Sequence, residues 1–167
     1  MFKLNDKVVY PGHGVAKINR IIKKRIAESS SSFFELKFIH KNMTILVPVD
    51  NAESVGIRSL SSQGNLDTIF TILSQPLTPF NHEAIVANWN KRNKDYLGKI
   101  RTGDLKEIGA IYRDLRHAEM CKELSFGERK LLVDTEALLV EEIALVQNIE
   151  ENIALQQIRS VIVNKSL

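Results

Sequence analysis

The chemistry that this sequence can offer is concentrated around its single tryptophan. Residues 88–103 read NWNKRNKDYLGKIRTG, and Trp89 is followed by five Lys or Arg residues within this stretch. A lone large aromatic residue at helical spacing is usually part of a core. Beside a cationic surface, however, such a ring can insert between bases or stack on them. The stretch therefore indicates either a core tryptophan or a non-covalent site for nucleic acid.

The basic residues nearest to Trp89 are Lys91, Arg92 and Lys94. The same predicted helix carries an apolar stripe formed by Tyr96, Leu97 and Ile100. Because one helix face cannot hold both sets, we expect the cations to lie on the flanks and the back of this stripe. In that position they could neutralise phosphates next to the indole.

A second pair of cations, Arg129 and Lys130, comes just inside a helix that the capping sequence SFGE at 125–128 is expected to begin. The free N–H groups and the dipole at a helix N-terminus favour an anion such as phosphate. Arg129 and Lys130 are therefore candidate DNA-binding residues as well. The sequence leaves open whether they lie near Trp89.

Catalytic groups do not converge anywhere in the sequence. The four histidines are scattered without metal-ligand spacing, and the single cysteine, Cys121, has no evident partner. Gly12-His13-Gly14 follows a predicted strand but precedes another strand, so it is interpreted as a turn and not as a phosphate loop. Two acidic pairs, Glu141-Glu142 and Glu150-Glu151, are expected on the surface. We expect no enzyme activity, no metal site and no cofactor.

A third basic group, Lys23, Lys24 and Arg25, stands at the end of a predicted strand. It adjoins Ser29–Ser32, which is expected to form a flexible hairpin tip. A solvated hairpin end and a charged anchor for an acidic protein surface remain alternative interpretations.

Residues 1–60 are predicted to form four or five short antiparallel strands, because runs of β-branched and aromatic residues alternate with turn signals. These runs lie at residues 7–10, 15–25, 33–40 and 43–49. Pro48 inside the last run indicates an edge strand or a strand end. A small barrel is the architecture that fits so few strands.

From about residue 64 the apolar period becomes helical. The expected apolar faces begin with Leu66, Ile69, Phe70 and Leu73, continue with Ile85, Val86 and the residues around Trp89, and reach Ile149, Ile153, Ile158, Val161 and Ile162 in the last helix. Asp104 with Glu107 resembles a capping start. The sequence thus predicts an α+β protein with a β domain at 1–62 and a bundle of about five helices at 63–167.

The charge is unevenly distributed, since the formal net charge is +4 for residues 1–80, +3 for 81–122 and −4 for 123–167. A surface for a polyanion is therefore expected mainly in the first two thirds of the chain. The single cysteine fits a reducing compartment, and no segment approaches the roughly 20 apolar residues of a membrane span. We expect a cytoplasmic protein without a membrane partner.

Five blocks of the sequence together resemble the CarD family of bacterial transcription regulators. They are FKLNDKVVYPGHGVAKI, VPVDNAESVGIRSL, the tryptophan followed by basic residues, TGDLKEIGAIYRDL and LSFGERKLL. The similarity covers nearly the whole chain in the same order, which makes it far more specific than any single motif.

The resemblance implies a Tudor-like, SH3-like barrel that binds the β subunit of RNA polymerase and a helical domain that binds promoter DNA. Trp89 matches the family tryptophan, which wedges into the minor groove at the upstream edge of the transcription bubble and stabilises the open complex. Lys91 and Lys94 match the basic residues after that tryptophan, and Arg129 matches the basic residue after the LSxGE motif. The DNA contact would be largely independent of sequence, and a monomer is expected.

For the polymerase contact, Lys24 matches a basic position of the family, and Arg25 stands beside it. Leu46 is a departure, because the family commonly has a basic residue there. Two alternatives remain: a protein-interaction module without direct DNA contact, in which Trp89 is core, and an RNA-binding protein. The RNA alternative is weaker, because the strands lack a paired aromatic platform.

Overall fold

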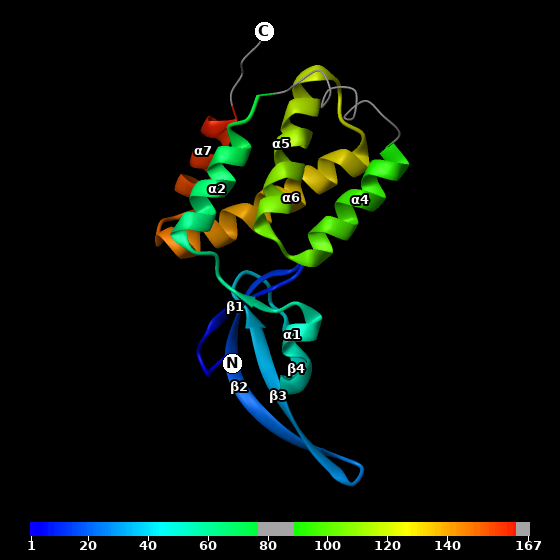
Figure 1. The fold of residues 1–167 in the computed structure, drawn as a ribbon, viewed down its shortest axis with the longest axis vertical. Helices are drawn as coiled ribbons and strands as arrows, with labels where there is room; N and C mark the ends of the chain where they lie inside the picture. Colours follow the sequence, from blue (N-terminus) through cyan, green and yellow to red (C-terminus); the bar gives the residue numbers. More distant parts are fainter. Residues whose placement is uncertain (77–88, 163–167) are drawn as a thin grey trace. The chain divides into compact units, whose positions relative to one another are not determined.

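The computed structural model describes residues 1–76 and 89–162 (Figure 1). The chain divides into two compact units, Met1–Leu60 and Ser61–Leu167, called here the β unit and the helical unit. Each has its own hydrophobic core. The architecture is an antiparallel sheet followed by helices, as the sequence predicts. Within the described residues, no helix has the length and apolar character needed to cross a membrane.

The β unit is a five-stranded antiparallel sheet with the strand order β4-β3-β2-β1-β5. The strands are β1 (Lys7–Tyr10), β2 (Gly14–Ile26), β3 (Ser29–Phe38), β4 (Thr44–Pro48) and β5 (Arg58–Ser59), with the short helices η1 (Val49–Asn51) and α1 (Ala52–Val55) before β5. One face of the sheet is apolar and buried; its side chains include those of Val8, Ile18, Phe34, Leu36 and Val47. Burial of this face against η1 and α1 holds the unit together.

The prediction of a flexible hairpin tip at Ser29–Ser32 is wrong. These serines begin β3 and pair with Lys23–Ile26, so that Ala27 and Glu28 alone form the turn. Figure 1 shows the hairpin of β2 and β3 extending beyond the rest of the sheet, and the pairing with β4 ends at Phe33, so residues 23–32 form this arm. Both faces of this arm are largely exposed toward its tip, and polar serines are compatible with a strand whose backbone is already paired. β2 and β3 are therefore longer than predicted.

Two local predictions in the β unit are confirmed. Pro48 is the last residue of β4, which is an edge strand, so its missing N–H costs no ladder hydrogen bond. Gly12-His13-Gly14 connects β1 to β2, with Gly12 and Gly14 at φ values of 76° and 104°, which favour glycine.

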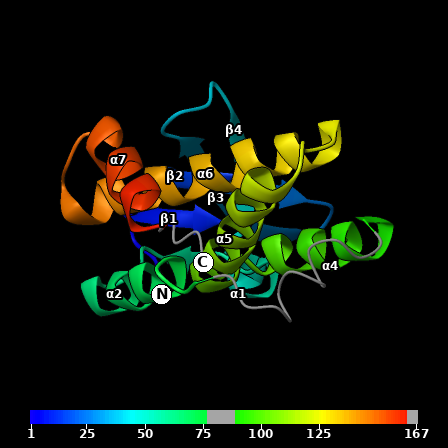
Figure 2. The same ribbon diagram turned by 90° about the horizontal axis from the view of Figure 1, so that it is seen from above.

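The helical unit contains α2 (Gln63–Leu73), α4 (Trp89–Thr102), α5 (Leu105–Cys121), α6 (Phe126–Gln147) and α7 (Glu151–Val161). The predicted contributions of Ile85 and Val86 lie outside the described residues. Figure 2 shows α5 between α2 and α4. Among the described residues, the largest fully buried side chain is that of Tyr112, on α5, and its hydroxyl donates to Glu136 Oε2 at 2.6 Å.

The helix starts follow the predicted capping residues. The Asp104 side chain accepts from the Lys106 N–H at the start of α5. Ser125 and Glu128 form a complete capping box at the start of α6. Glu107, by contrast, forms an ion pair with Lys99 at 3.6 Å. The local sequence thus sets where these helices begin.

Two surface assignments need correction. Glu142, expected on the surface, is 2% exposed, and its Oε1 accepts from both the backbone N–H and the hydroxyl of Ser61 at 2.8 Å. A buried carboxylate needs such donors to offset its lost hydration. Leu97, expected on the apolar stripe of its helix, is 40% exposed, whereas Tyr96 and Ile100 pack against the core.

Candidate functional site

Trp89 is the first described residue of α4 and is partly buried against the helical core. Its indole comes close to the first turn of α6. A Cβ atom placed on Gly127 would lie 3.3 Å from Cζ2 and 3.5 Å from Nε1 of Trp89. Glycine at position 127 therefore leaves the room that this ring occupies. The indole is neither sealed in the core nor fully free.

Arg92, one turn after Trp89, is directed inward. Its guanidinium carbon lies 5.5 Å from the centroid of the Trp89 ring and 5.9 Å from that of Tyr96. Its Nη2 is 3.2 Å from Oε2 of Glu128, and only 12% of its side chain is exposed. This arrangement separates Arg92 from the exposed lysines with which it was grouped as a DNA-binding residue, and makes it a support for the indole.

Glu128 joins α4 to the start of α6. Its side chain is 2% exposed and accepts from Arg92, from Lys122 Nζ at 3.0 Å and from the Ser125 N–H at 3.2 Å. Burial alone would raise the pKa of this carboxyl, but the hydrogen bonds from Lys122 and Ser125 outweigh burial and hold the pKa below its ordinary value. The carboxylate therefore stays ionised and holds Arg92 in place.

Tyr96 completes the packing around Arg92. Burial, followed by the negative charge of Asp114, raises the pKa of the Tyr96 hydroxyl to about 12. Tyr96 is therefore neutral at physiological pH, and its ring offers a π face to the guanidinium. Two aromatic rings and one carboxylate thus fix a single arginine.

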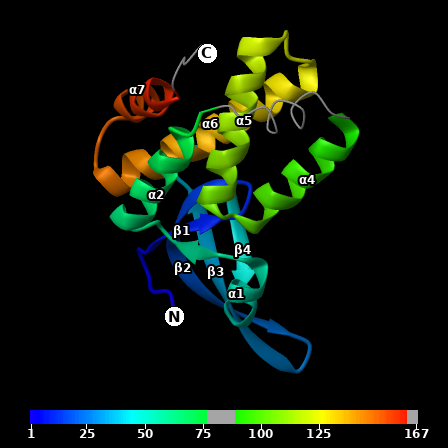
Figure 3. The ribbon, with the colours of Figure 1, turned by 45° about the horizontal axis from the view of Figure 1, so that its top comes forward.

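The remaining predicted cations are exposed around this end of the helical unit. Lys91 and Lys94 are exposed on α4, and Arg129 and Lys130 are exposed in the first turns of α6. Figure 3 shows the beginnings of α4 and α6 at the same end of this unit, in agreement with the Gly127 and Glu128 contacts. Arg129 also pairs with Glu123 at 3.0 Å, with side-chain exposures of 59% and 87%. So exposed a pair is weak and leaves Arg129 available to another anion.

The roles of Gly127 and Glu128 as supports of Trp89 are not predicted from the sequence. The signal was the SFGE box itself, whose glycine and glutamate were interpreted only as part of a helix start. In the structure these four residues begin α6, and two of them, Gly127 and Glu128, also contact the Trp89 and Arg92 side chains of α4.

In the β unit the strand register separates the predicted polymerase-binding residues. Lys24 pairs with Ser31, and Leu46 pairs with Glu35. Ser31 and Glu35 are four residues apart on β3 and point to one face, so Lys24 and Leu46 share that face. Arg25 pairs with Ser30 and points to the opposite face. The structure therefore puts Lys24 and Leu46 on one face of the sheet, on the two strands that flank β3, and Arg25 on the other face.

The face shared by Lys24 and Leu46, called here the outer face, also carries an ion pair. Arg20 donates to both carboxylate oxygens of Glu35, from Nε at 2.9 Å and from Nη2 at 2.8 Å. The hydrogen bonds from Arg20, with another from Asn19, lower the pKa of Glu35 to about 2. Leu46 is 39% exposed and Arg20 68% exposed. The outer face thus combines apolar and basic groups.

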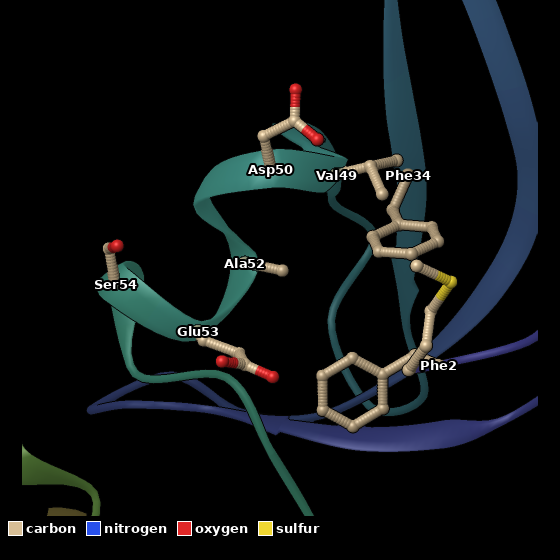
Figure 4. Close-up of a pocket in the computed structure, with 8 residues that line it drawn as sticks. Phe2, Phe34, Val49, Asp50, Ala52, Glu53 and Ser54 are labelled. Carbon is tan, nitrogen blue, oxygen red and sulfur yellow. The ribbon is translucent and has the colours of Figure 1, made fainter.

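A pocket of about 290 Å³ lies in the β unit, lined in part by Phe2, Phe34, Ala52 and Glu53. Figure 4 shows the two phenylalanine rings along one side and the turn that carries Ala52 and Glu53 along the other. Phe34 belongs to the buried face of the sheet. The pocket is therefore separate from the outer face. Within residues 1–76 and 89–162, no group of His, Cys, Asp or Glu is arranged to hold a metal ion.

Comparison with known proteins gives two family matches that together span most of the chain. Residues 2–61 match the CarD-like/TRCF RID domain, and residues 68–159 match the CarD C-terminal domain. The chain belongs to the CarD family. It is also 29% identical over 155 residues to "Putative transcription factor YdeB" of Bacillus subtilis (strain 168), an alignment that covers 90% of this chain and 95% of that protein.

Membership of the CarD family gives the protein a transcription factor-like role without enzymatic activity. The RID match identifies the β unit as a region that interacts with RNA polymerase. The α+β fold that the resemblance implied is confirmed.

Proposed function

We propose that this CarD-family protein binds the β subunit of RNA polymerase through the outer face of the β unit and promoter DNA through the Trp89 end of the helical unit. In this proposal Trp89 wedges into the minor groove at the upstream edge of the transcription bubble. The bound protein stabilises the open complex, carries out no reaction and requires no cofactor.

The observation that carries the DNA half is the convergence of α4 and α6. The partly exposed indole lies against the first turn of α6, which continues into exposed Arg129 and Lys130, and its own helix α4 carries exposed Lys91 and Lys94. Cations that contact phosphates position a protein on DNA without reading its sequence. When an aromatic group enters a base step of a closed duplex, unstacking the two base pairs costs a few kcal/mol. At the edge of a bubble the bases are already unstacked, so the ring can enter without this cost.

Differential affinity follows from this arrangement. A ligand shifts an equilibrium only by its preference for one of the two states. A ring that fits the disrupted step better than the closed duplex lengthens the lifetime of the open complex. The phosphate contacts contribute equally to binding of the open complex and of the closed duplex. They therefore raise the affinity without favouring either state.

On the polymerase side, Lys24 and Leu46 are proposed to meet the β subunit, with Arg25 outside the contact. Because adjacent residues of a strand point to opposite faces, a partner on the outer face reaches Lys24 but not Arg25. Lys24→Glu and Arg25→Glu therefore form a matched pair with the same charge change.

The test is the open-complex lifetime with purified cognate polymerase. We expect Trp89→Ala to shorten the lifetime while it retains polymerase binding. Lys24→Glu should lose recruitment, and Arg25→Glu should behave as wild type. Equal losses for the two charge reversals would exclude the outer face as the specific contact, and a normal lifetime with Trp89→Ala would exclude the wedge.

DNA affinity of the chain alone provides a second measurement. Four phosphate contacts correspond to a log–log salt slope of about −3.6, because each contact contributes about −0.9. A slope near zero would contradict the DNA half of the proposal.

The alternative function is a protein-interaction module without direct DNA contact. It is favoured by the packing of Trp89 against the core and by the ion pair that occupies Arg92. Acrylamide quenching of Trp89 fluorescence in the presence of DNA distinguishes the two functions. A wedge becomes protected when DNA is bound, whereas in the alternative DNA leaves the quenching unchanged.

A further inference from the structure

Phe126 is the first residue of α6 and is 87% exposed. The other large apolar side chains that are exposed in the described part of the helical unit, Leu97, Met120, Val133 and Ile153, are aliphatic. Single exposed apolar residues are common on proteins and usually carry no function. The location of Phe126 is what sets it apart.

Phe126 is followed by Gly127, which the Trp89 indole approaches. After Gly127 comes the buried Glu128, which pairs with Arg92. Exposed Arg129 and Lys130 follow in the same helix. An exposed aromatic ring therefore lies in the same first turn of α6 that supports the proposed wedge, next to the exposed cations Arg129 and Lys130, the first of which pairs with exposed Glu123. A core role is excluded by its exposure.

The two aromatic residues differ in freedom. The Trp89 ring is confined by Gly127 and Arg92, so it presents a fixed edge to a partner. The Phe126 side chain extends into solvent and can adjust its rotamer to a neighbouring surface. A rigid wedge next to an adjustable ring suits a surface on which one base step is opened and an adjacent base or sugar is left exposed.

We propose that Phe126 is a second DNA-contacting aromatic residue, which packs on an unstacked base at the junction between duplex and single strand, next to the step that Trp89 enters. This inference rests on the proposed DNA-binding function and adds a residue to it. The ligand is forked DNA: the cations bind the phosphates of its duplex arm, and the ring of Phe126 covers a base that has lost its stacking neighbour.

The test uses the full chain and a fluorescently labelled forked duplex with 2-aminopurine at its first unpaired position. Phe126→Ala should weaken binding about tenfold, the order expected when one base-stacking aromatic is removed. Phe126→Trp should restore the affinity, because it retains a flat ring. Wild-type protein should change the 2-aminopurine emission, and Phe126→Ala should lose that change.

Val133→Ala is the matched control, because Val133 is an apolar residue of the same helix and is 65% exposed. It should bind as wild type. Phe126→Ala with wild-type affinity and emission change, beside a weakened Trp89→Ala, would overturn this inference and leave the proposed function standing. A Trp89→Ala variant that binds like wild type would overturn both. Thermal unfolding should be alike for wild type and Phe126→Ala, because the side chain is almost fully exposed.

Discussion

Arg92 on α4 and Glu128 on α6 lie 3.2 Å apart, from Nη2 to Oε2, with 12% and 2% of their side chains exposed. Glu128 is at the same time the third residue of α6 and completes its capping box. A residue of the α6 capping box therefore also fixes Arg92, the α4 side chain that packs on Trp89. This relationship leads to predictions about stability and about the environment of Trp89.

Removal of the Glu128 carboxylate should destabilise the helical unit strongly. Glu128→Ala leaves Arg92 buried without this counter-ion and removes one half of the capping box, so we expect a loss of about 3 kcal/mol or more in the free energy of unfolding. Urea unfolding followed by Trp89 fluorescence measures this loss, because Trp89 is the single tryptophan. Glu123→Ala is the control: its ion pair with Arg129 is exposed and should contribute less than about 1 kcal/mol. Similar losses in the two variants would disprove the role of Glu128.

Local signals made some parts of this arrangement predictable. The four residues of the SFGE box determine where α6 begins. Pro48 restricts β4 to the edge of the sheet, whatever the fold of the other segments. Such features depend on backbone hydrogen bonds within one turn or one strand end. They are visible in the sequence because cause and effect are adjacent.

The incorrect predictions concern residues whose hydrogen-bond partners are distant in the sequence. Glu142 can be buried because Ser61 donates hydrogen bonds to its carboxylate, and Ser61 lies 81 positions away in the sequence. Arg92 turns inward because Glu128, 36 positions away, is present to pair with it. Ser29–Ser32 form a strand because the β2 backbone opposite them completes the ladder. Only the fold brings these partners together, so residue type and spacing could not reveal them.

Acid should destabilise the helical unit in two steps. His117 is 4% exposed, and burial, assisted by the positive charge of Arg113, lowers its pKa from 6.5. A depressed histidine pKa means that the fold favours the neutral form, so its contribution is complete above pH 6.5 and declines as the pH falls below that value. The lowered pKa of Glu128 contributes stability above pH 4.5 that is lost as the pH falls through the folded-state pKa.

Urea midpoints at pH 7, 5.5, 4.5 and 3, recorded by Trp89 fluorescence, measure these two steps. His117→Gln should flatten the change between pH 7 and 5.5, and Glu128→Gln should flatten the change between pH 4.5 and 3. Midpoints that do not vary across this range would contradict both assignments.

The hydrogen bonds from Ser61 to the buried carboxylate of Glu142 should hold the chain just before α2 against α6. Ser61→Ala removes the hydroxyl donor but keeps the backbone N–H, so we expect a loss of about 1 kcal/mol in the free energy of unfolding. Glu142→Ala removes the acceptor for both groups and should cost about 2–3 kcal/mol. The same urea experiment measures these losses, with Ser160→Ala as an exposed control in α7. A larger loss for Ser61→Ala than for Glu142→Ala would contradict this account.

Gly127→Ala should displace the Trp89 indole. The added Cβ would lie 3.3 Å from Cζ2 of the ring, closer than an ordinary van der Waals contact, so the indole must shift by a few tenths of an ångström. The ring is already partly exposed, and the shift therefore moves it further into water. We expect a red-shifted emission and stronger acrylamide quenching for this variant.

Gly98→Ala separates that displacement from a general effect of glycine replacement. Gly98 lies in the middle of α4, and a Cβ placed there has no neighbour within 4 Å. Alanine should stabilise the helix by about 0.5–1 kcal/mol, because it loses less backbone entropy on folding than glycine. Trp89 emission should remain unchanged in Gly98→Ala. If both variants changed the emission alike, Gly127 would not be the residue that determines where the indole lies, and the contact between α4 and α6 could not be what presents Trp89 to a partner.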